Sequence, residues 1–482
     1  MKVLFIVNIA DLGFEEPLGI LYLSAIAKQK GHQIFVVENE FEAVEKKIRE
    51  IKPDFLAISV LTPNFSYMYQ LLKEVKTKHN IPTLLGGPHA TYFPEIIKEE
   101  GIDYVFRGES EIAFLIFLDS FENNKPIDET PNLVYFNNGE VKANQIMNLI
   151  HNLDDIPFPD REIFIEYKQF YKSDVRSVMA SRGCPYNCSY CFNNEYQEIY
   201  KGLGERLRVR SVDNVIAECR ELKERYGARM IHFFDDIFPF RKDWVEEFSE
   251  KYKKEVDLPF LTNTSFNICS EHYVSNLSKA GCKCLLIGVE TGNEYFRDKI
   301  LFRKMKNKTM IEKAKLIHSY GIKVYAQNLI GIPHGSLELD METLRLNIKL
   351  KADYAGAYLC QPYPKTPIEK IARESNLLEE GKDFNRSFYY SSNLKIDEKE
   401  LVERLRVIFP IVVNYPFLLS FIYLLLKMPI MPFQAVGKLL HGYKIKTIML
   451  RYKMGARKFI HFLFLFFSRR INRMIVVKQG GK

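Results

Sequence analysis

The sequence predicts an α/β protein with three parts: an N-terminal doubly wound parallel sheet, a partial (β/α)6 barrel and a C-terminal helical segment. Two series of short β-rich runs that alternate with helical runs predict the first two parts, because strands spaced by helices form parallel βαβ units. Long helical runs after about residue 397 predict the third part. A chain of 482 residues is long enough for two or three domains with sizeable cores.

The first series of strands and helices occupies residues 1–140. Ligands of such sheets bind at the carboxyl ends of the strands, so the small and polar residues found there are candidate binding residues. No GxGxxG follows the first strand, which argues against a dinucleotide site. The expected strands are KVLFIVN, QIFVVE, DFLAISVL, IPTLLGG and IDYVFRGE, and the candidates after them are Asn8, Gly13, Gly19, Ser59, Thr62, Gly86, Gly87, Gly108 and Glu109.

A second series of strands and helices occupies residues 173–385, after an irregular linker over 141–172 that contains DDIPFPDRE. Six βα units fall short of the eight that close a full barrel, so the sequence predicts an open, partial one. The expected strands are VRSVMASRGC, MIHFFDD, PFLTNTS, CLLIGVET, KVYAQNLIGI and AGAYLCQPYP.

The N-terminus reads as a first β-strand and not as a signal peptide, since acidic residues follow its apolar run without a small-residue cleavage site. We therefore expect a cytoplasmic protein. In a reducing compartment, cysteines scattered along the chain are expected to be free, buried thiols. These are Cys219, Cys269, Cys282, Cys284 and Cys360.

The C-terminal part, residues 386–482, carries the basic character of the chain. No acidic residue follows Glu403, whereas 404–482 contains 15 Lys or Arg, so the net charge of +8 leaves −7 for the first 403 residues. Val407–Leu426 is uncharged, but Pro410, Asn414 and Pro416 interrupt it, which favours a buried or interfacial helix over a spanning one.

The stretch FIHFLFLFF (459–467) is flanked by basic residues, which suits an anionic membrane surface. Peripheral membrane contact through 404–473 is therefore one expectation, and a helical cap over the barrel mouth with a solvated basic face is the other. Nucleic acid is a weaker option, because the basic residues alternate with blocks of Leu, Ile and Phe and not with exposed stacking aromatics.

Three of the eight cysteines fall within eight residues, at Cys184, Cys188 and Cys191. Three thiolates spaced CxxxCxxC can hold one inorganic centre from a single loop, and a cubane iron-sulfur cluster held by three cysteines keeps one iron open for a ligand. A structural zinc site needs four closed ligands, which no second pair supplies. A crowded trio of cysteines in the cytosol also argues against disulfides.

This cysteine loop, with Tyr190 before its last cysteine, resembles the signature of the radical S-adenosylmethionine (SAM) enzymes. The resemblance implies a partial (β/α)6 barrel and a [4Fe-4S] cluster whose open iron binds SAM. An electron, from a donor such as a flavodoxin or ferredoxin, then cleaves SAM to a 5′-deoxyadenosyl radical. The three cysteines would thus be both the metal ligands and the catalytic residues.

Three further segments resemble SAM-binding motifs of the same family. FFDDIF offers Asp235 and Asp236 for the SAM ammonium group, and the sequence does not decide between them. GVETGNE places Glu290 near the ribose, and NLIGIP places Gly331 and Ile332 against the adenine. One departure concerns the third strand, where Ser265 and Asn267 stand in place of the basic residue that often binds the SAM carboxylate.

The first 140 residues resemble the cobalamin-binding domain that precedes the barrel in one subgroup, and the two resemblances together cover about 1–385. The resemblance rests on EPLGILYLSAIAKQKGH, PDFLAISVLTPN, LLGGPHAT and DYVFRGESE. The DxHxxG motif that supplies a cobalt-ligating histidine is absent, so His32 and His89 are expected to be surface or loop histidines. Any bound cobalamin would then have an open or water-bound lower face.

The resemblance implies a cobalamin-dependent methylase acting on an unactivated carbon of a small-molecule substrate. A tail that touches membrane would favour a lipid-linked or isoprenoid-linked substrate. A radical rearrangement or ring-forming enzyme without methyl transfer is the alternative within enzymes. A cobalamin- and iron-sulfur-binding protein without catalysis is the alternative outside them.

Overall fold

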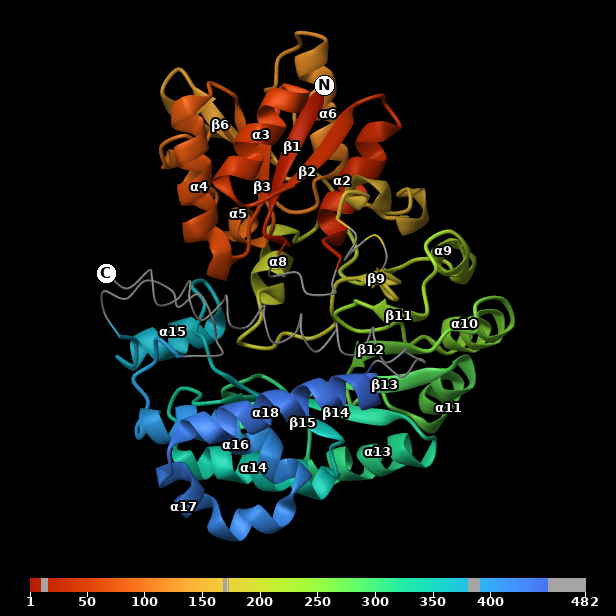
Figure 1. The fold of residues 1–482 in the computed structure, drawn as a ribbon, viewed down its shortest axis with the longest axis vertical. Helices are drawn as coiled ribbons and strands as arrows, with labels where there is room; N and C mark the ends of the chain where they lie inside the picture. The colour runs from red at the N-terminus through yellow and green to blue at the C-terminus, as the bar shows by residue number, and fades with distance from the viewer. Residues whose placement is uncertain (10–15, 168–170, 172, 380–390, 450–482) are drawn as a thin grey trace. The chain divides into compact units, whose positions relative to one another are not determined.

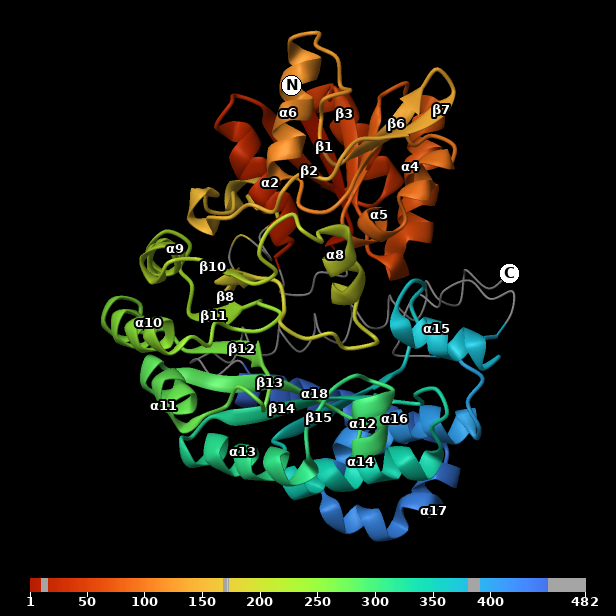
Figure 2. The same cartoon turned by 180° about the vertical axis from the view of Figure 1, so that it is seen from behind.

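The computed structural model describes residues 1–9, 16–167, 171, 173–379 and 391–449, which are drawn as ribbons in Figures 1 and 2. Within these residues the chain forms two compact units, one of 1–177 and 192–214 and the other of 178–191, 215–379 and 391–449. The predicted binding residue Gly13 and the apolar stretch 459–467 lie outside the described residues.

The first unit is built on a seven-stranded sheet in the order β2-β1-β3-β4-β5-β6-β7. Its first five strands are parallel and coincide with the five predicted ones. The two strands that follow them, β6 and β7, are antiparallel additions that the sequence did not predict. The strands are β1 (Lys2–Val7), β2 (Gln33–Glu38), β3 (Phe55–Ser59), β4 (Thr83–Gly86), β5 (Tyr104–Phe106), β6 (Leu133–Asn137) and β7 (Glu140–Ala143).

Helices cover this parallel sheet, which is why β1 and β3 are nearly continuous runs of buried apolar residues. One amphipathic example is α3, which buries Val44 and Ile48 and exposes its charged residues. The helices of the sheet are α2 (Leu18–Lys28), α3 (Phe41–Ile51), α4 (Phe65–Lys78), α5 (Pro88–Tyr92) and α6 (Glu111–Glu122).

The predicted linker packs within this unit through a buried ion-pair network. The Glu16 carboxylate accepts hydrogen bonds from Arg161 Nε at 3.2 Å, Arg176 Nη1 at 3.0 Å and the Ser177 amide at 2.8 Å. Since all three charged side chains are less than 5% exposed, each would be costly to bury without the others. Beyond the cysteine loop, α8 (Asn193–Ile199) and β10 (Arg208–Val209) also belong to this unit.

A second sheet contains the six strands of the predicted partial barrel, in the order β15-β14-β13-β12-β11-β8, and β11 to β15 lie wholly in the second unit. The pairs from β11 to β15 are parallel, as predicted. The strands are β8 (Val175–Val178), β11 (Met230–Phe233), β12 (Phe260–Thr264), β13 (Cys282–Glu290), β14 (Lys323–Ile330) and β15 (Tyr354–Leu359), and a short β9 (Ser181–Arg182) follows β8.

Helices cover one face of the β11–β15 sheet. Phe233 of β11 packs against Phe248 and Tyr252 of α10, and Asn328 of β14 hydrogen-bonds with Asn347 of α14. Because side chains alternate along a strand, the neighbours of Phe233 and Asn328 point to the opposite face. The helices are α9 (Val212–Glu224), α10 (Lys242–Glu255), α11 (Glu271–Ala280), α12 (Glu294–Lys299), α13 (Asn307–Ser319), α14 (Leu337–Leu350) and α15 (Pro367–Glu374).

The described part of the C-terminal region packs on the barrel as several helices. The buried residues of α16 (Lys399–Asn414) face β15 and α14. The uncharged run over 407–426 is divided among α16, a 3-10 segment at Pro416–Phe421 and α17 (Ile422–Lys427), which α18 (Ile430–Lys444) follows. In the part of the chain that the structure describes, no helix is long and apolar enough to cross a membrane.

Candidate functional site

The cysteine loop lies just after β8 and is fixed by backbone contacts within the second unit. The Cys191 amide donates to the Cys188 carbonyl at 3.1 Å, which closes a tight turn between the two cysteines. Ser189 anchors the loop, since its hydroxyl donates to the Ile300 carbonyl at 2.5 Å and its own carbonyl accepts from Ile368. None of the three cysteines of the loop is in a disulfide, so together they offer a donor set that fits a cluster held by three thiolates.

Glu290 stands at the end of β13 in a buried network beside Cys188. Its Oε1 accepts hydrogen bonds from the Tyr190 hydroxyl at 2.8 Å and from Arg303 Nη1 at 3.2 Å. Arg303 Nη1 also donates to the Tyr190 oxygen at 2.9 Å and lies 4.0 Å from Cys188 Sγ. Burial raises the pKa of the Cys188 thiol, and the Arg303 guanidinium acts in the opposite direction.

The backbone at Glu290 is strained, which is common at functional sites. Its φ of +64° lies in the left-handed region, and the register of β13 against β14 shifts between Gly288 and Glu290. A Cβ at Gly288 would come within 2.2 Å of Glu290 Oε1 and 2.9 Å of Arg303 Nη1. A side chain at Gly288 would therefore displace the Glu290–Arg303 ion pair from its observed position.

Two predicted residues, Asp235 and Asp236, follow β11 in very different surroundings. Asp235 is fully buried, and its carboxylate accepts from the Ser181 amide at 2.5 Å, the Ser181 hydroxyl at 2.6 Å and the Ala180 amide at 3.3 Å. Asp236 is exposed. Asp235 thus holds the backbone that leads into the cysteine loop, and Asp236 is the one accessible from solvent.

Burial raises the pKa of Asp235 to about 7, although the hydrogen bonds from Ser181 act to lower it. Between pH 4 and 7 the folded chain therefore binds a proton that the unfolded chain has lost, so stability falls as pH rises through this window. We expect Asp235→Asn to remove this slope, which is at most roughly 4 kcal/mol. Urea unfolding at several pH values measures it. Asp236→Asn is the matched control and should keep the wild-type slope.

The predicted adenine contacts, Gly331 and Ile332, follow β14 at the same end of the sheet. The Gly331 amide donates to both carboxylate oxygens of Asp340, at 3.2 and 3.0 Å, and burial raises the pKa of Asp340 to about 8. Gly331 has a φ of +63°, and a Cβ there would lie 2.7 Å from Ile396 Cδ1. Ile332 is buried in an apolar cluster against which Tyr190 packs.

In the first unit, the ends of β3 and β4 bring together Ser59, Thr62, Gly86 and Gly87. Ser59 is exposed, and a Cβ at Gly86 would meet no atom within 4 Å, so this edge is open above β4. Gly87 differs, since a Cβ there would lie 2.8 Å from the Val60 amide. The open edge offers room and uncharged hydrogen-bonding groups, which suits a large planar macrocycle.

We expect Gly87→Ala to destabilise the first unit by about 2 kcal/mol or more, because Gly87 combines φ +91° and ψ −178°, a conformation that essentially only glycine adopts. Gly86→Ala is the matched control. It adds a methyl group into open space at a negative φ and should cost well under half as much. Chemical denaturation of the two variants provides the comparison, and equal losses would contradict this assignment.

Gly108 and Glu109, which the sequence also nominated, are covered by the segment after the cysteine loop. The Tyr200 hydroxyl accepts from the Glu109 amide at 2.7 Å, and a Cβ at Gly108 would overlap it. The Glu109 carboxylate accepts from Tyr196 at 2.9 Å and from Arg208 at 2.9 Å. Glu109 therefore holds that segment on the sheet.

His32 and His89 were expected to be surface or loop histidines, and both are buried. The prediction is wrong for His89, which lies in a helix; His32 does lie in a loop, but not at the surface. His89 lies within α5, stacked between Phe65 and Phe93. His32 lies next to the amino end of β1, where its Nδ1 is 3.2 Å from the N-terminal amine. That is the opposite end of the sheet from the strand ends that bind ligands.

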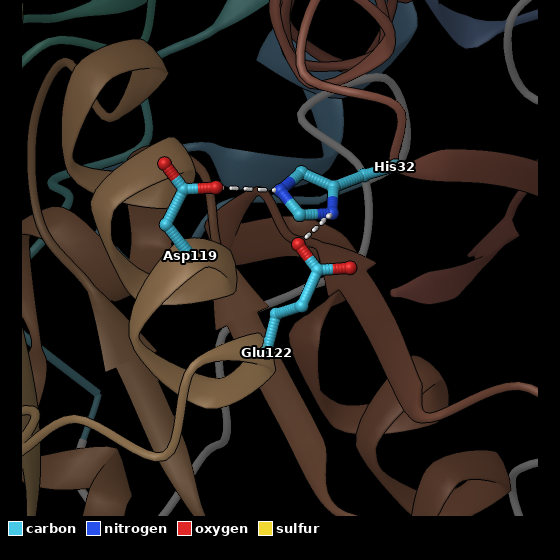
Figure 3. A group of neighbouring side chains, drawn as sticks. All are labelled: His32, Asp119 and Glu122. Atoms are coloured by element: carbon cyan, nitrogen blue, oxygen red, sulfur yellow. Dashed lines mark hydrogen bonds and ion pairs between the residues drawn. The ribbon is translucent and has the colours of Figure 1, made fainter.

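Figure 3 shows His32 between two carboxylates of α6. Its Nε2 lies 2.9 Å from Asp119 Oδ1, and its Nδ1 lies 4.0 Å from Glu122 Oε2. Because the carboxylates face different ring nitrogens, the arrangement suits ion pairing more than one shared metal ion.

Sequence reasoning did not nominate Arg303, Asp340 or Ser189. Each acts through a partner that lies far away in the sequence or through the backbone, so no local motif marks it. Burial of a charged side chain could not be read from the sequence.

Comparison with protein families gives two matches. The radical SAM superfamily matches residues 178–346, and the B12 binding domain matches residues 6–118. An uncharacterized methyltransferase of Pyrococcus horikoshii is 29% identical over 374 residues, which are 75% of this chain and 79% of the relative. An anaerobic magnesium-protoporphyrin IX monomethyl ester cyclase of Rubrivivax gelatinosus is 26% identical over 417 residues, 80% of this chain and 72% of the relative.

Two solved structures share the fold. TsrM from Kitasatospora setae, a radical S-adenosylmethionine methyltransferase solved with cobalamin and a [4Fe-4S] cluster bound, has a TM-score of 0.65 at 15% identity over 78% of each chain. OxsB, a cobalamin-dependent S-adenosylmethionine radical enzyme solved with aqua-cobalamin and S-adenosylmethionine bound, has a TM-score of 0.68 at 13% identity over 99% of this chain and 80% of its own.

Proposed function

Because the chain belongs to the radical SAM superfamily and carries a B12 binding domain, we propose that it is a cobalamin-dependent methylase that acts on an unactivated carbon. When bound, the cluster and SAM supply a radical that removes a hydrogen atom, and cobalamin supplies the methyl group. The observation that carries the proposal is the trio of cysteines on one loop, beside the buried Glu290 network, in a chain with a B12 binding domain.

The residues of the second unit take distinct roles in this proposal. Cys184, Cys188 and Cys191 hold the cluster. Asp236 receives the SAM ammonium group, because Asp235 is buried and occupied by Ser181. Glu290 orients the ribose and is itself held by Tyr190 and Arg303.

Arg303 supplies the positive charge that Ser265 and Asn267 lack. Ser265 is buried, and Asn267 Nδ2 donates to the Lys304 carbonyl at 3.4 Å. The guanidinium of Arg303 lies within the Glu290 network beside the cysteine loop, where a bound carboxylate would gain a charged donor. Gly331 and Ile332 form the adenine side of the site, and Ser59, Thr62 and Gly86 offer the open edge for cobalamin.

We propose an uncharged, lipid-linked or isoprenoid-linked substrate. On the face of the barrel sheet opposite α10 and α14, strand alternation places mostly uncharged side chains, and the charged groups beside it, Glu290 and Arg303 next to Gly288, are paired with each other. Tyr325 and Tyr358 on this face join through their hydroxyl oxygens at 3.2 Å. Such a surface suits an apolar molecule with a few hydrogen-bonding groups more than a phosphorylated anion. The other members of the face are Phe234, Asn263, Leu286, Gln327 and Leu329.

The function is tested by anaerobic incubation of the reconstituted protein with SAM and a reductant. We propose a flavodoxin or a ferredoxin as the electron donor. Methylation should give both S-adenosylhomocysteine and 5′-deoxyadenosine. Formation of 5′-deoxyadenosine alone would exclude methyl transfer and leave the ring-forming alternative. The similarity to the cyclase of Rubrivivax gelatinosus supports that alternative. Absence of both products would favour a binding protein without catalysis. Mass spectrometry of cell lipids with and without the gene would then identify the methylated class.

A further inference from the structure

The last described helices expose an unusual number of large apolar side chains. Nine of them between 417 and 443 are at least 42% exposed, and Met431 reaches 77%. Monomeric soluble proteins rarely expose contiguous apolar patches of this kind, and patches rimmed by polar groups mark interaction sites. We call these nine residues the C-terminal apolar face: Phe417, Phe421, Tyr423, Leu424, Met428, Met431, Val436, Leu439 and Tyr443.

The exposed residues of α18 follow the helical repeat. Met431, Ala435, Leu439 and Tyr443 recur every four residues and are all exposed, so they form one apolar stripe along the helix. The opposite side of this helix is attached to the barrel, since Lys444 Nζ donates to the Asp353 carbonyl at 3.0 Å and His441 Nδ1 lies 2.9 Å from the Tyr354 oxygen. The stripe therefore cannot turn inward without loss of these contacts.

Basic residues predominate in the sequence that forms this face. No acidic residue follows Glu403, while 404–482 carries 15 basic residues. Lys427 is exposed within the face, and Lys438 follows on α18. The acidic residues beside the face are themselves paired with arginines. Glu338 of α14 accepts from Tyr423 at 3.0 Å and pairs with Arg345, and Glu400 pairs with Arg404, whose Nη1 donates to the Met428 carbonyl at 2.8 Å.

We propose that the C-terminal apolar face docks the protein on an anionic membrane surface. Apolar side chains bordered by lysines gain from burial at the lipid boundary and from attraction to anionic headgroups together. Four of the nine residues are Phe or Met, and two are tyrosines, whose amphipathic rings suit the headgroup level. The proposal is independent of the methylase reaction, because it rests only on the exposure and charge of α17 and α18.

Two other occupants fit the charge less well. Residues 450–482 carry nine of the basic residues and no acidic one, so contact with this face would leave its positive charge unneutralised. A second copy of the chain would bring the same basic face against itself, and like charges oppose such a contact. Anionic lipid is the occupant that can both bury the apolar side chains and neutralise the basic residues.

Vesicle co-sedimentation of the full-length protein tests the proposal. Binding should be strong on phosphatidylcholine vesicles that contain phosphatidylglycerol and weak on phosphatidylcholine alone, and it should weaken as salt is raised. Met431→Ser/Leu439→Ser should lower the partition coefficient at least about tenfold. Phe136→Ser is the matched control, since Phe136 is 45% exposed on β6, and it should bind as the wild type does.

A photo-cross-linker distinguishes the occupants directly. With Leu439→p-benzoylphenylalanine in the full-length protein and anionic vesicles present, the proposal expects cross-links to lipid. Cross-links to residues 450–482 or to a second copy under these conditions would overturn it, and so would equal binding to neutral and anionic vesicles. Circular dichroism of each variant verifies that a loss of binding is not a loss of folding.

Discussion

We expect Cys191→Ala to abolish formation of 5′-deoxyadenosine and to leave the protein folded. The Cys191 backbone N–H donates a hydrogen bond to the Cys188 carbonyl, and the substitution keeps this bond. The Cys191 side chain is only part-buried, so little packing is lost. A cubane cluster with two cysteine ligands in place of three loses the support that leaves a single iron open. Iron and sulfide analysis, with chromatography of the SAM products, measures the outcome.

The matched control for this variant is Cys219→Ala. Cys219 is buried on α9 and is not part of the cysteine loop, so its loss should lower stability modestly and keep both iron content and product formation. If Cys191→Ala retained iron and product at the level of Cys219→Ala, the assignment of the loop as the cluster site would be wrong.

We expect Arg303→Met to lower the free energy of unfolding by about 3 kcal/mol or more, because it leaves the Glu290 carboxylate buried without its cationic partner. Glu290 and Arg303 are 9% and 15% exposed, so water compensates little. Arg303→Lys should recover part of the loss, since a lysine keeps the charge and lacks the planar fork that reaches Glu290, Tyr190 and the Gly288 carbonyl. Urea denaturation measures each variant.

A double-mutant cycle separates the ion pair from simple loss of packing. Glu290→Gln/Arg303→Met removes both charges and should be more stable than Arg303→Met alone. If the losses in the free energy of unfolding of the two single variants add up to the loss in the double variant, the two side chains do not stabilise each other. Anaerobic SAM binding by the same variants then tests whether the network also prepares the site for its ligand.

Much of the fold could be predicted from the sequence, because its signals are local. Apolar runs separated by helical repeats predicted five strands of the first unit and six of the second, and the structure confirms them. The antiparallel pair β6 and β7 was missed because its strands lie in an irregular stretch where β7 is exposed along its whole length. Glu140–Ala143 does alternate polar and apolar residues, but four positions are too few to distinguish a strand from an irregular stretch.

The sequence by itself determined that the three cysteines lie together, since a loop of eight residues keeps its side chains close in any fold. It also determined that FFDDIF, GVETGNE and NLIGIP follow the loop in that order. Only the tertiary structure separated Asp235 from Asp236, because one is buried on Ser181 and the other is exposed. It alone placed Arg303 beside Glu290 and covered Glu109 with Arg208. These pairings join residues 13 and 99 positions apart, and the energy of a charge depends on its burial and its partners, which local sequence does not encode.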